Sequence, residues 1–218
     1  MCDDTDLARW AKMGLSRRQF SAIGVAAGIA ACTKPGNVKG KEIDLNEQMV
    51  RIATADGTMD AFFVHPASGA HPGVIVWPDI AGLRDTFKEM ARRLAGEGYA
   101  VLVLNPFYRD APAPQFSGFA DFAQKGGFQL VEPWRAKMTP DAVMRDGKAA
   151  GDWLGGQAAV DKAKGLGVQG YCMGGACAVR TAGALPEAVK AVGSFHGGAL
   201  AGDDAQAPAK LLAHTHAD

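Results

Sequence analysis

Two runs in which apolar and polar residues alternate open the body of the chain. The stretch "MVRIATADGTMDAFFVHP", residues 49–66, alternates on both sides of Asp56-Gly57. An Asp-Gly pair between two alternating runs is a strong signal for a tight hairpin turn. The pattern therefore predicts an antiparallel pair of strands at the edge of a sheet.

After the hairpin the pattern changes to short, nearly continuous apolar runs. "GVIVWP" at 73–78 and "YAVLVLNPF" at 99–107 are typical of parallel strands covered on both faces. Between them, "LRDTFKEMARRLAGEG" ends at glycines and places four apolar residues on one helical stripe, namely Leu83, Phe87, Met90 and Leu94. This order predicts a strand-helix-strand unit.

The segment from 110 to 139 is rich in proline, glycine and aromatic residues and has no clean period, so we expect an excursion that carries substrate contacts. Thr139 and Pro140 supply an N-cap and a first-turn proline for a helix running to about Leu154. The pattern then predicts a strand "KGLGVQGY", a helix from Met173, a strand "KAVGSFHG" and a last strand "AKLLAHTH". We therefore expect an α/β fold with an open, mostly parallel sheet and an N-terminal antiparallel hairpin.

Composition limits the classes of function. The chain has 218 residues, 48% of them hydrophobic, which suits one globular domain. Lysine plus arginine and aspartate plus glutamate both number 23, so no net charge is available to gather nucleic acid, and no nucleic-acid partner is expected.

The first 32 residues have the pattern of an export signal. "SRRQFSAIGVAAGIAAC", residues 16–32, sets two arginines before a mildly apolar run and resembles a bacterial twin-arginine signal. The alternative is an ordinary N-terminal helix with a basic start, although Gly24 and Gly28 would weaken it. We expect a signal segment at 1–32, read by the export machinery, then a linker at 33–47 and a hydrolase-like domain at 48–218.

The end of this segment, "IAAC", looks like a lipoprotein processing box with Cys32 as the lipid acceptor. The alternatives are simple cleavage near the same place and retention of the uncut segment. The sequence thus predicts an exported protein, either periplasmic or tethered to the membrane through Cys32.

A cysteine stands where an apolar strand meets a helix, in "GYCMGG". Gly170 and Gly174 flank Cys172 at two residues on either side, as in a nucleophile elbow with cysteine in place of serine. The helix N-terminus would stabilise a thiolate and direct free N-H groups at a nearby anion. The alternative is that Cys172 is a small buried hydrophobic residue, and this is the interpretation that we favour for Cys177.

At these residues the sequence resembles the dienelactone hydrolase family of α/β hydrolases, from about residue 48 onward. The resemblance is carried by five stretches in the family's order: "HPGVIVWPDIAGL", "GYAVLVLNPFYR", "MRDGKAAGDWL", "GYCMGG" and "LLAHTHAD". It implies a Cys-His-Asp triad with Cys172 as nucleophile and Asp218 as the acid that orients the histidine. It also implies an oxyanion hole formed by the backbone N-H groups of Met173 and Ile80.

Two further positions follow from the resemblance. Asp79 stands where the family has a glutamate that contacts the resting nucleophile, and it is one methylene shorter. Arg109 in "NPFYRD" falls near an arginine that binds the substrate carboxylate in the family, whereas the alternative for it is a solvated surface arginine.

The family's histidine should follow the acid by some tens of residues, and the chain ends at Asp218. We therefore expect that the domain is truncated at its C-terminus, because no helix follows the predicted last strand. His196 is expected at the carboxyl edge of the sheet, where it would line the pocket or act as the base. The other histidines are expected at the surface or on the last strand, namely His65, His71, His214 and His216, and no metal or cofactor is expected.

The sequence therefore predicts a hydrolase of small esters or lactones that uses a cysteine nucleophile. The alternative is a domain that keeps the fold and the pocket for binding but lacks the triad histidine. A third interpretation, redox use of Cys172 and Cys177, leaves the elbow glycines unexplained.

Overall fold

A six-stranded sheet with the order β1-β2-β4-β3-β5-β6 forms the centre of the fold. The computed structural model describes residues 43–215 and residue 217. The signal segment and Cys32, most of the linker, His216 and Asp218 lie outside the described residues. No helix in the described part of the chain has both the length and the apolar character needed to cross a membrane.

The predicted hairpin is confirmed. β1 (Leu45–Thr54) pairs antiparallel with β2 (Gly57–Pro66), and Gly57 takes a φ of 139° at the turn. Only Ala55 and Asp56 lie between the two strands. β1 begins at Leu45, inside the stretch expected to be a linker, because the pairing of Leu45 with Pro66 extends the ladder past the alternating run.

The parallel core is also confirmed. β3 (Gly73–Trp77) pairs in parallel with β4 (Ala100–Leu104) and with β5 (Leu166–Tyr171), and β5 pairs in parallel with β6 (Val189–Phe195). The strands β3 and β4 are buried along their whole length. Both faces are covered, which explains the continuous apolar runs.

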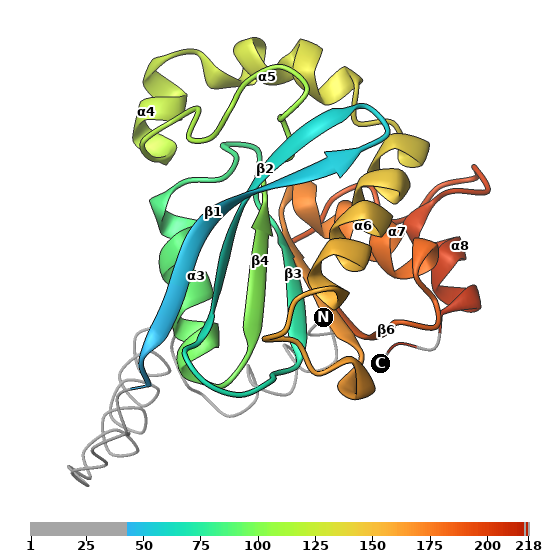
Figure 1. Cartoon of the computed structure of the whole chain (residues 1–218). Coiled ribbons are helices and arrows are strands. Elements are labelled where there is room, and N and C mark those ends of the chain that lie inside the picture. Colours follow the sequence, from blue (N-terminus) through green and yellow to red (C-terminus); the bar gives the residue numbers. More distant parts are fainter. Residues whose placement is uncertain (1–42, 216, 218) are drawn as a thin grey trace, which may run out of the picture. The chain divides into compact units, whose positions relative to one another are not determined.

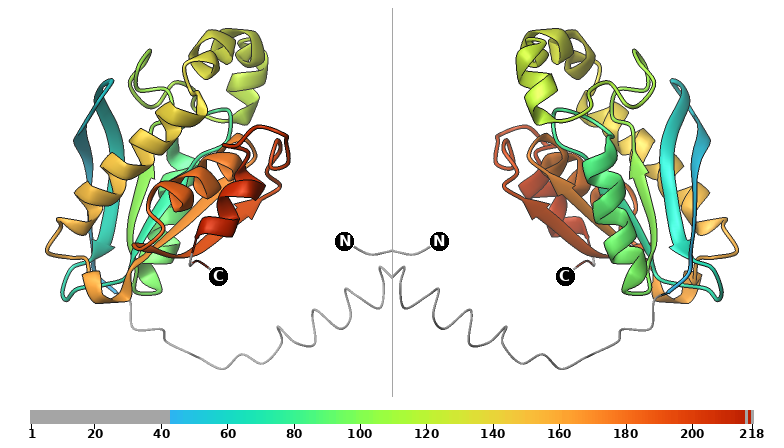
Figure 2. Two further views of the ribbon diagram at one scale, coloured as in Figure 1. Left: turned by 90° about the vertical axis from the view of Figure 1, so that its right-hand side faces the viewer. Right: turned by 90° about the vertical axis from the view of Figure 1, so that its left-hand side faces the viewer.

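Helices cover the two faces of this sheet (Figure 1; Figure 2). α3 (Asp85–Gly96) lies on one face, where Phe87 joins Val74 and Val76 in a buried cluster. α6 (Pro140–Gly155) and α7 (Met173–Ala184) lie on the other, where Trp77 and Ile75 are buried. Successive residues of β3 therefore point to opposite faces, as the pleat of a strand requires.

The predicted cap of α6 is present, since the Thr139 hydroxyl accepts a hydrogen bond from the backbone N-H of Ala142 at 3.3 Å.

The excursion that precedes α6 contains two helices that its lack of period concealed, α4 (Phe119–Gln124) and α5 (Gly127–Ala136). They lie beyond the carboxyl ends of the central strands (Figure 1). A separate apolar cluster, which includes Phe116, Phe122 and Ile80, packs this two-helix segment against the loop that follows β3.

The predicted last strand "AKLLAHTH" is wrong. The chain instead forms a short helix, α8 (Pro208–Leu211), followed by a 3-10 turn at Leu212–His214, and the sheet ends at β6. Pro208 occupies the first turn of this helix, where its fixed φ is favourable and its missing N-H costs nothing. Leu211 lies over Gly183 of α7, so the apolar residues cover a helix rather than extend the sheet.

Candidate active site

The chain reverses direction at Cys172, between the end of β5 and the start of α7. Cys172 has a φ of 53° and a ψ of −116°, a conformation that residues with side chains rarely adopt. Its N-H donates to the Phe195 carbonyl and its own carbonyl accepts from the Gly175 N-H, both at 3.0 Å. These bonds hold a strained residue in place, which is a common feature of functional sites.

The flanking glycines are required by close contact. A Cβ at Gly170 would lie 1.9 Å from the Gly174 carbonyl oxygen, and a Cβ at Gly174 would lie 2.4 Å from the Trp77 carbonyl oxygen. Neither oxygen can move without displacing a helix or a strand. These contacts are the steric reason for the glycine spacing that predicted the strand-helix turn.

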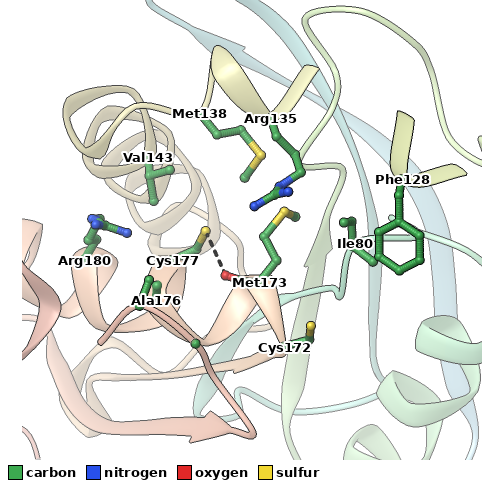
Figure 3. A pocket seen from close by; sticks show the side chains of 12 residues that line it. Ile80, Phe128, Arg135, Met138, Val143, Cys172, Met173, Ala176, Cys177 and Arg180 are labelled. Atoms are coloured by element: carbon green, nitrogen blue, oxygen red, sulfur yellow. Dashed lines mark hydrogen bonds between the residues drawn. The ribbon is translucent and has the colours of Figure 1, made fainter. Parts of the chain in front are cut away.

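A pocket of about 400 Å³ opens beside Cys172 (Figure 3). Ile80 and Met173 line it together with Cys172, so the structure brings the predicted nucleophile and both predicted oxyanion residues to one cavity. Within the described residues, no hydrogen-bond acceptor is recorded for the backbone N-H of either Ile80 or Met173. Both donors are available to an anion that forms next to the half-buried Cys172.

Asp79, which was expected near the nucleophile, is instead bound by residues of its own loop. Its carboxylate accepts two hydrogen bonds from Arg84, at 2.7 and 2.8 Å, and one from the Ala81 N-H at 2.9 Å. Arg84 is almost fully buried and also donates to the Gly82 carbonyl. In the described structure no hydrogen bond joins Asp79 to Cys172, so the shorter side chain stabilises the loop that carries Ile80.

Arg109 lies in a network of charged groups and does not line the pocket. It donates to both oxygens of Asp146 at 2.9 Å and to Asp56 at 2.6 Å. The Tyr108 hydroxyl donates to the same Asp146 carboxylate at 2.7 Å. Arg109 therefore links the hairpin turn to α6, and the geometry does not support the carboxylate-binding role that the resemblance implied.

Burial and hydrogen bonding shift the pKa values of the two carboxylates of this network in opposite directions. Burial raises the pKa of Asp146 above its ordinary value, although the hydrogen bonds from Arg109 and Tyr108 act in the opposite direction. Asp56 is exposed to solvent, and its hydrogen bonds from Arg109 and Arg145 lower its pKa. The network therefore stabilises the fold. Its most buried carboxylate, that of Asp146, accepts hydrogen bonds from both Arg109 and Tyr108.

His196 is at the carboxyl end of β6, as predicted, but it does not line the pocket. Its backbone has a φ of 44°, its side chain is exposed, and its ring lies 6.4 Å from the ring of Tyr171. Gly198 and Ala199 of the same loop reach the pocket instead. None of the histidines with described side chains, His65, His71 and His196, lines the pocket.

The two charged residues of the pocket escaped the sequence analysis. Arg180 lies on the face of α7 that also carries Cys172, Met173, Ala176 and Cys177, so helical spacing counted from Cys172 would have found it. Arg135 comes from α5, and the aperiodic excursion gave no signal for it.

Cys177 is buried and its thiol donates to the Met173 carbonyl at 3.6 Å. Burial raises the pKa of Cys177 to about 12, so its thiol stays protonated at neutral pH. The predicted packing role for Cys177 fits this environment.

The Gly174→Ala substitution should destabilise the fold. The added Cβ would meet a carbonyl oxygen of β3, and we expect the free energy of unfolding in urea to fall by about 3 kcal/mol. Gly96→Ala is the matched control, because a Cβ there meets nothing within 4 Å and alanine favours the helix. A change below about 0.5 kcal/mol for Gly174→Ala would contradict the steric account.

The two cysteines should differ in reaction with iodoacetamide. Since the raised pKa keeps Cys177 protonated, we expect peptide mapping at pH 7.5 to show alkylation of Cys172 in the native protein and of Cys177 only after unfolding. Ionising Cys177 is unfavourable in the folded state, so stability should fall as pH rises above the ordinary thiol pKa of about 8.5. Equal labelling of both cysteines in the native protein would contradict this assignment.

Comparison with known proteins places the chain in a family. A protein of Methylorubrum extorquens named "Putative carboxymethylenebutenolidase" is 30% identical over 178 residues, which are 79% of this chain and 58% of that protein. A protein of the same name from Synechocystis is 26% identical and is covered over 61% of its length. The chain thus spans less than two thirds of these curated relatives.

Solved structures agree in fold. A structure named "Putative Dienelactone Hydrolase", from Klebsiella pneumoniae, superposes with a TM-score of 0.64 at 20% identity, and the match covers 80% of this chain and 70% of that one. The dienelactone hydrolase-like promiscuous phosphotriesterase P91, from metagenomic libraries, gives 0.57 at 29% identity over 74% of this chain and 63% of that one. The model of the dienelactone hydrolase family matches residues 59–215, and the chain belongs to that family.

Proposed function

We propose that the protein hydrolyses small esters or lactones and that Cys172 is the nucleophile. The observation that carries the proposal is the strained backbone of Cys172, which lines one pocket with Ile80 and Met173, and the backbone N-H groups of those two residues have no acceptor among the described residues. Membership of the family supports the class of reaction, and the names of the two curated relatives are consistent with it.

The first half of the reaction follows from this geometry. The Cys172 thiolate attacks the carbonyl carbon and forms a carbon-sulfur bond, while the carbonyl electron pair moves onto oxygen. The Met173 and Ile80 N-H groups donate to that oxyanion. When the intermediate collapses, the bond to the alcohol oxygen breaks, the alkoxide leaves and takes a proton from water, and a thioester remains on the enzyme.

Cys172 is the N-cap residue of α7. It stands at the positive end of the dipole of a helix of 12 residues, which favours the negative charge of an oxyanion that forms there. Release of the acid then needs a water molecule and a base to accept its proton. The resemblance assigns that base to a histidine. The roles that we propose for the described residues therefore cover the acylation step.

A binding-only domain is the second candidate, because none of the histidines with described side chains lines the pocket. In that case the pocket would hold an ester without forming a thioester. The two functions therefore differ in whether an acyl group becomes attached to Cys172.

Acylation should be visible directly. With nitrophenyl acetate we expect one acetyl group per folded chain on Cys172, found by peptide mass spectrometry, together with a matching burst of nitrophenolate. Cys172→Ala should abolish both signals, while Cys177→Ala should keep them. If Cys172 were acetylated no faster in the folded protein than in an unfolded control, the catalytic hypothesis would be rejected and the binding-only domain favoured.

We also propose export through residues 1–32, a hypothesis that rests on the sequence. Replacing Arg17 and Arg18 by lysine should retain the protein in the cytoplasm of a bacterial host, as judged by cell fractionation. Cys32→Ser should leave export intact and remove any attached lipid, as judged by intact mass. Unchanged fractionation of the double-lysine variant would reject the signal.

A further inference from the structure

An exposed aromatic side chain forms part of the wall of the pocket beside Cys172. Phe128, in the first turn of α5, lines this pocket and is 57% exposed. It is the one aromatic residue among the described residues that line the pocket, whereas Ile80 and Ala176 in the same wall are buried. An apolar surface that faces both a pocket and solvent is available to a ligand.

The backbone around Phe128 fixes the position of its ring. Gly126 precedes α5 with a φ of 64°, and Gly127 lies so close to Phe122 that a Cβ there would overlap the Phe122 ring. The Phe128 ring meets the buried Phe122 ring in an edge arrangement, with centroids 4.9 Å apart and planes at 78°. The ring is therefore in place before a ligand arrives, which reduces the entropy that binding costs.

The pocket has an open side and a closed side. Phe128 and Ala199 are exposed, whereas Val143 and Ala176 are buried. In the view of Figure 3, Phe128 lies toward one end of the pocket and Val143 toward the other. When a thioester forms, the acyl group stays on Cys172 and the alcohol departs first, so the alcohol part of an ester fits the open side.

We propose that the protein selects esters of phenols and that Phe128 determines this specificity, because its ring stacks on the ring of the bound phenol. This inference rests on the proposed function. Two aromatic rings gain from offset or edge-to-face contact beyond the apolar area that they bury. The Cys172 thiolate attacks the ester carbonyl, the bond to the phenol oxygen breaks, the phenoxide leaves and takes a proton from water, and the acyl group stays on sulfur.

Phe119 provides a matched control for Phe128. It is 53% exposed on α4, and its ring stacks on the same Phe122 ring, with centroids 5.4 Å apart and planes at 27°. Phe119 does not line the pocket. The two phenylalanines therefore share exposure and an aromatic partner but differ in access to a ligand.

The test compares phenyl acetate with trifluoroethyl acetate, an activated ester whose alcohol has no ring. Because the two esters differ in intrinsic reactivity, each variant is compared with the wild type on the same ester. Phe128→Leu should lower the second-order rate of Cys172 acetylation, measured by peptide mass spectrometry, by about 3- to 10-fold for phenyl acetate and by less than about twofold for trifluoroethyl acetate.

Two further variants separate stacking from general damage. Phe128→Tyr should recover most of the phenyl acetate rate that Phe128→Leu loses, because it restores the ring. Phe119→Leu should change neither rate by more than about twofold. An unchanged phenyl acetate rate in Phe128→Leu would overturn the proposal, and so would an equal loss for both esters.

The position of the ring within the substrate provides a second criterion. Trifluoroethyl phenylacetate carries its ring on the acyl side, away from Phe128 in the proposed orientation. Phe128→Leu should lower its rate of acylation by less than about twofold. A loss as large as that for phenyl acetate would overturn the assignment of Phe128 to the alcohol side.

A binding measurement separates this inference from the proposed function. Phenyl acetate titrated into the Cys172→Ala protein, followed by ligand-observed NMR, should bind, and adding Phe128→Leu should weaken the binding by about 3- to 10-fold. Binding that depends on Phe128, without acylation by any ester, would keep the stacking site and reject the hydrolase. Acylation whose rate does not depend on Phe128 would keep the hydrolase and reject the stacking site.

Discussion

The close approach of α7 to strands β3 and β5 is the constraint on which the site depends. Gly174 brings the backbone of the helix against the Trp77 carbonyl, and Gly170 lets the end of β5 pass within contact of the same turn. A side chain at either position would push the helix away from the sheet. With the helix so near, the chain has only one residue in which to reverse, and that residue, Cys172, takes the strained conformation.

The same constraint explains why hydrogen-bond donors are already in place at the site. A helix that begins directly at the turn leaves the N-H of Met173, the residue after Cys172, without an acceptor among the described residues. The loop after β3 supplies the second donor at Ile80, and the buried pair of Asp79 and Arg84 holds that loop in shape. Charge pairing therefore fixes the donor in advance, so that little reorganisation is needed when an oxyanion forms.

The local parts of the site were predictable and the long-range parts were not. Glycine spacing around Cys172 reports a steric requirement within five residues, so the sequence shows it directly. By contrast, the sequence does not show whether Arg109 binds substrate or pairs with carboxylates of the protein itself. Its partners, Asp56 and Asp146, are remote in sequence. The short apolar run near Leu211 is equally ambiguous, because only contact with α7 decides between strand and helix.

The arginines of this fold show how partners, rather than residue type, decide between structure and binding. Arg109 has two carboxylates within hydrogen-bond distance, and its charge is neutralised by the fold. Arg180 has no acidic neighbour among the described residues that line its pocket, and its buried Nε lacks an acceptor. An unpaired cation beside apolar walls gains most from an anion, so this pocket differs from the rest of a neutral chain in carrying positive charge that the described residues lining it do not balance.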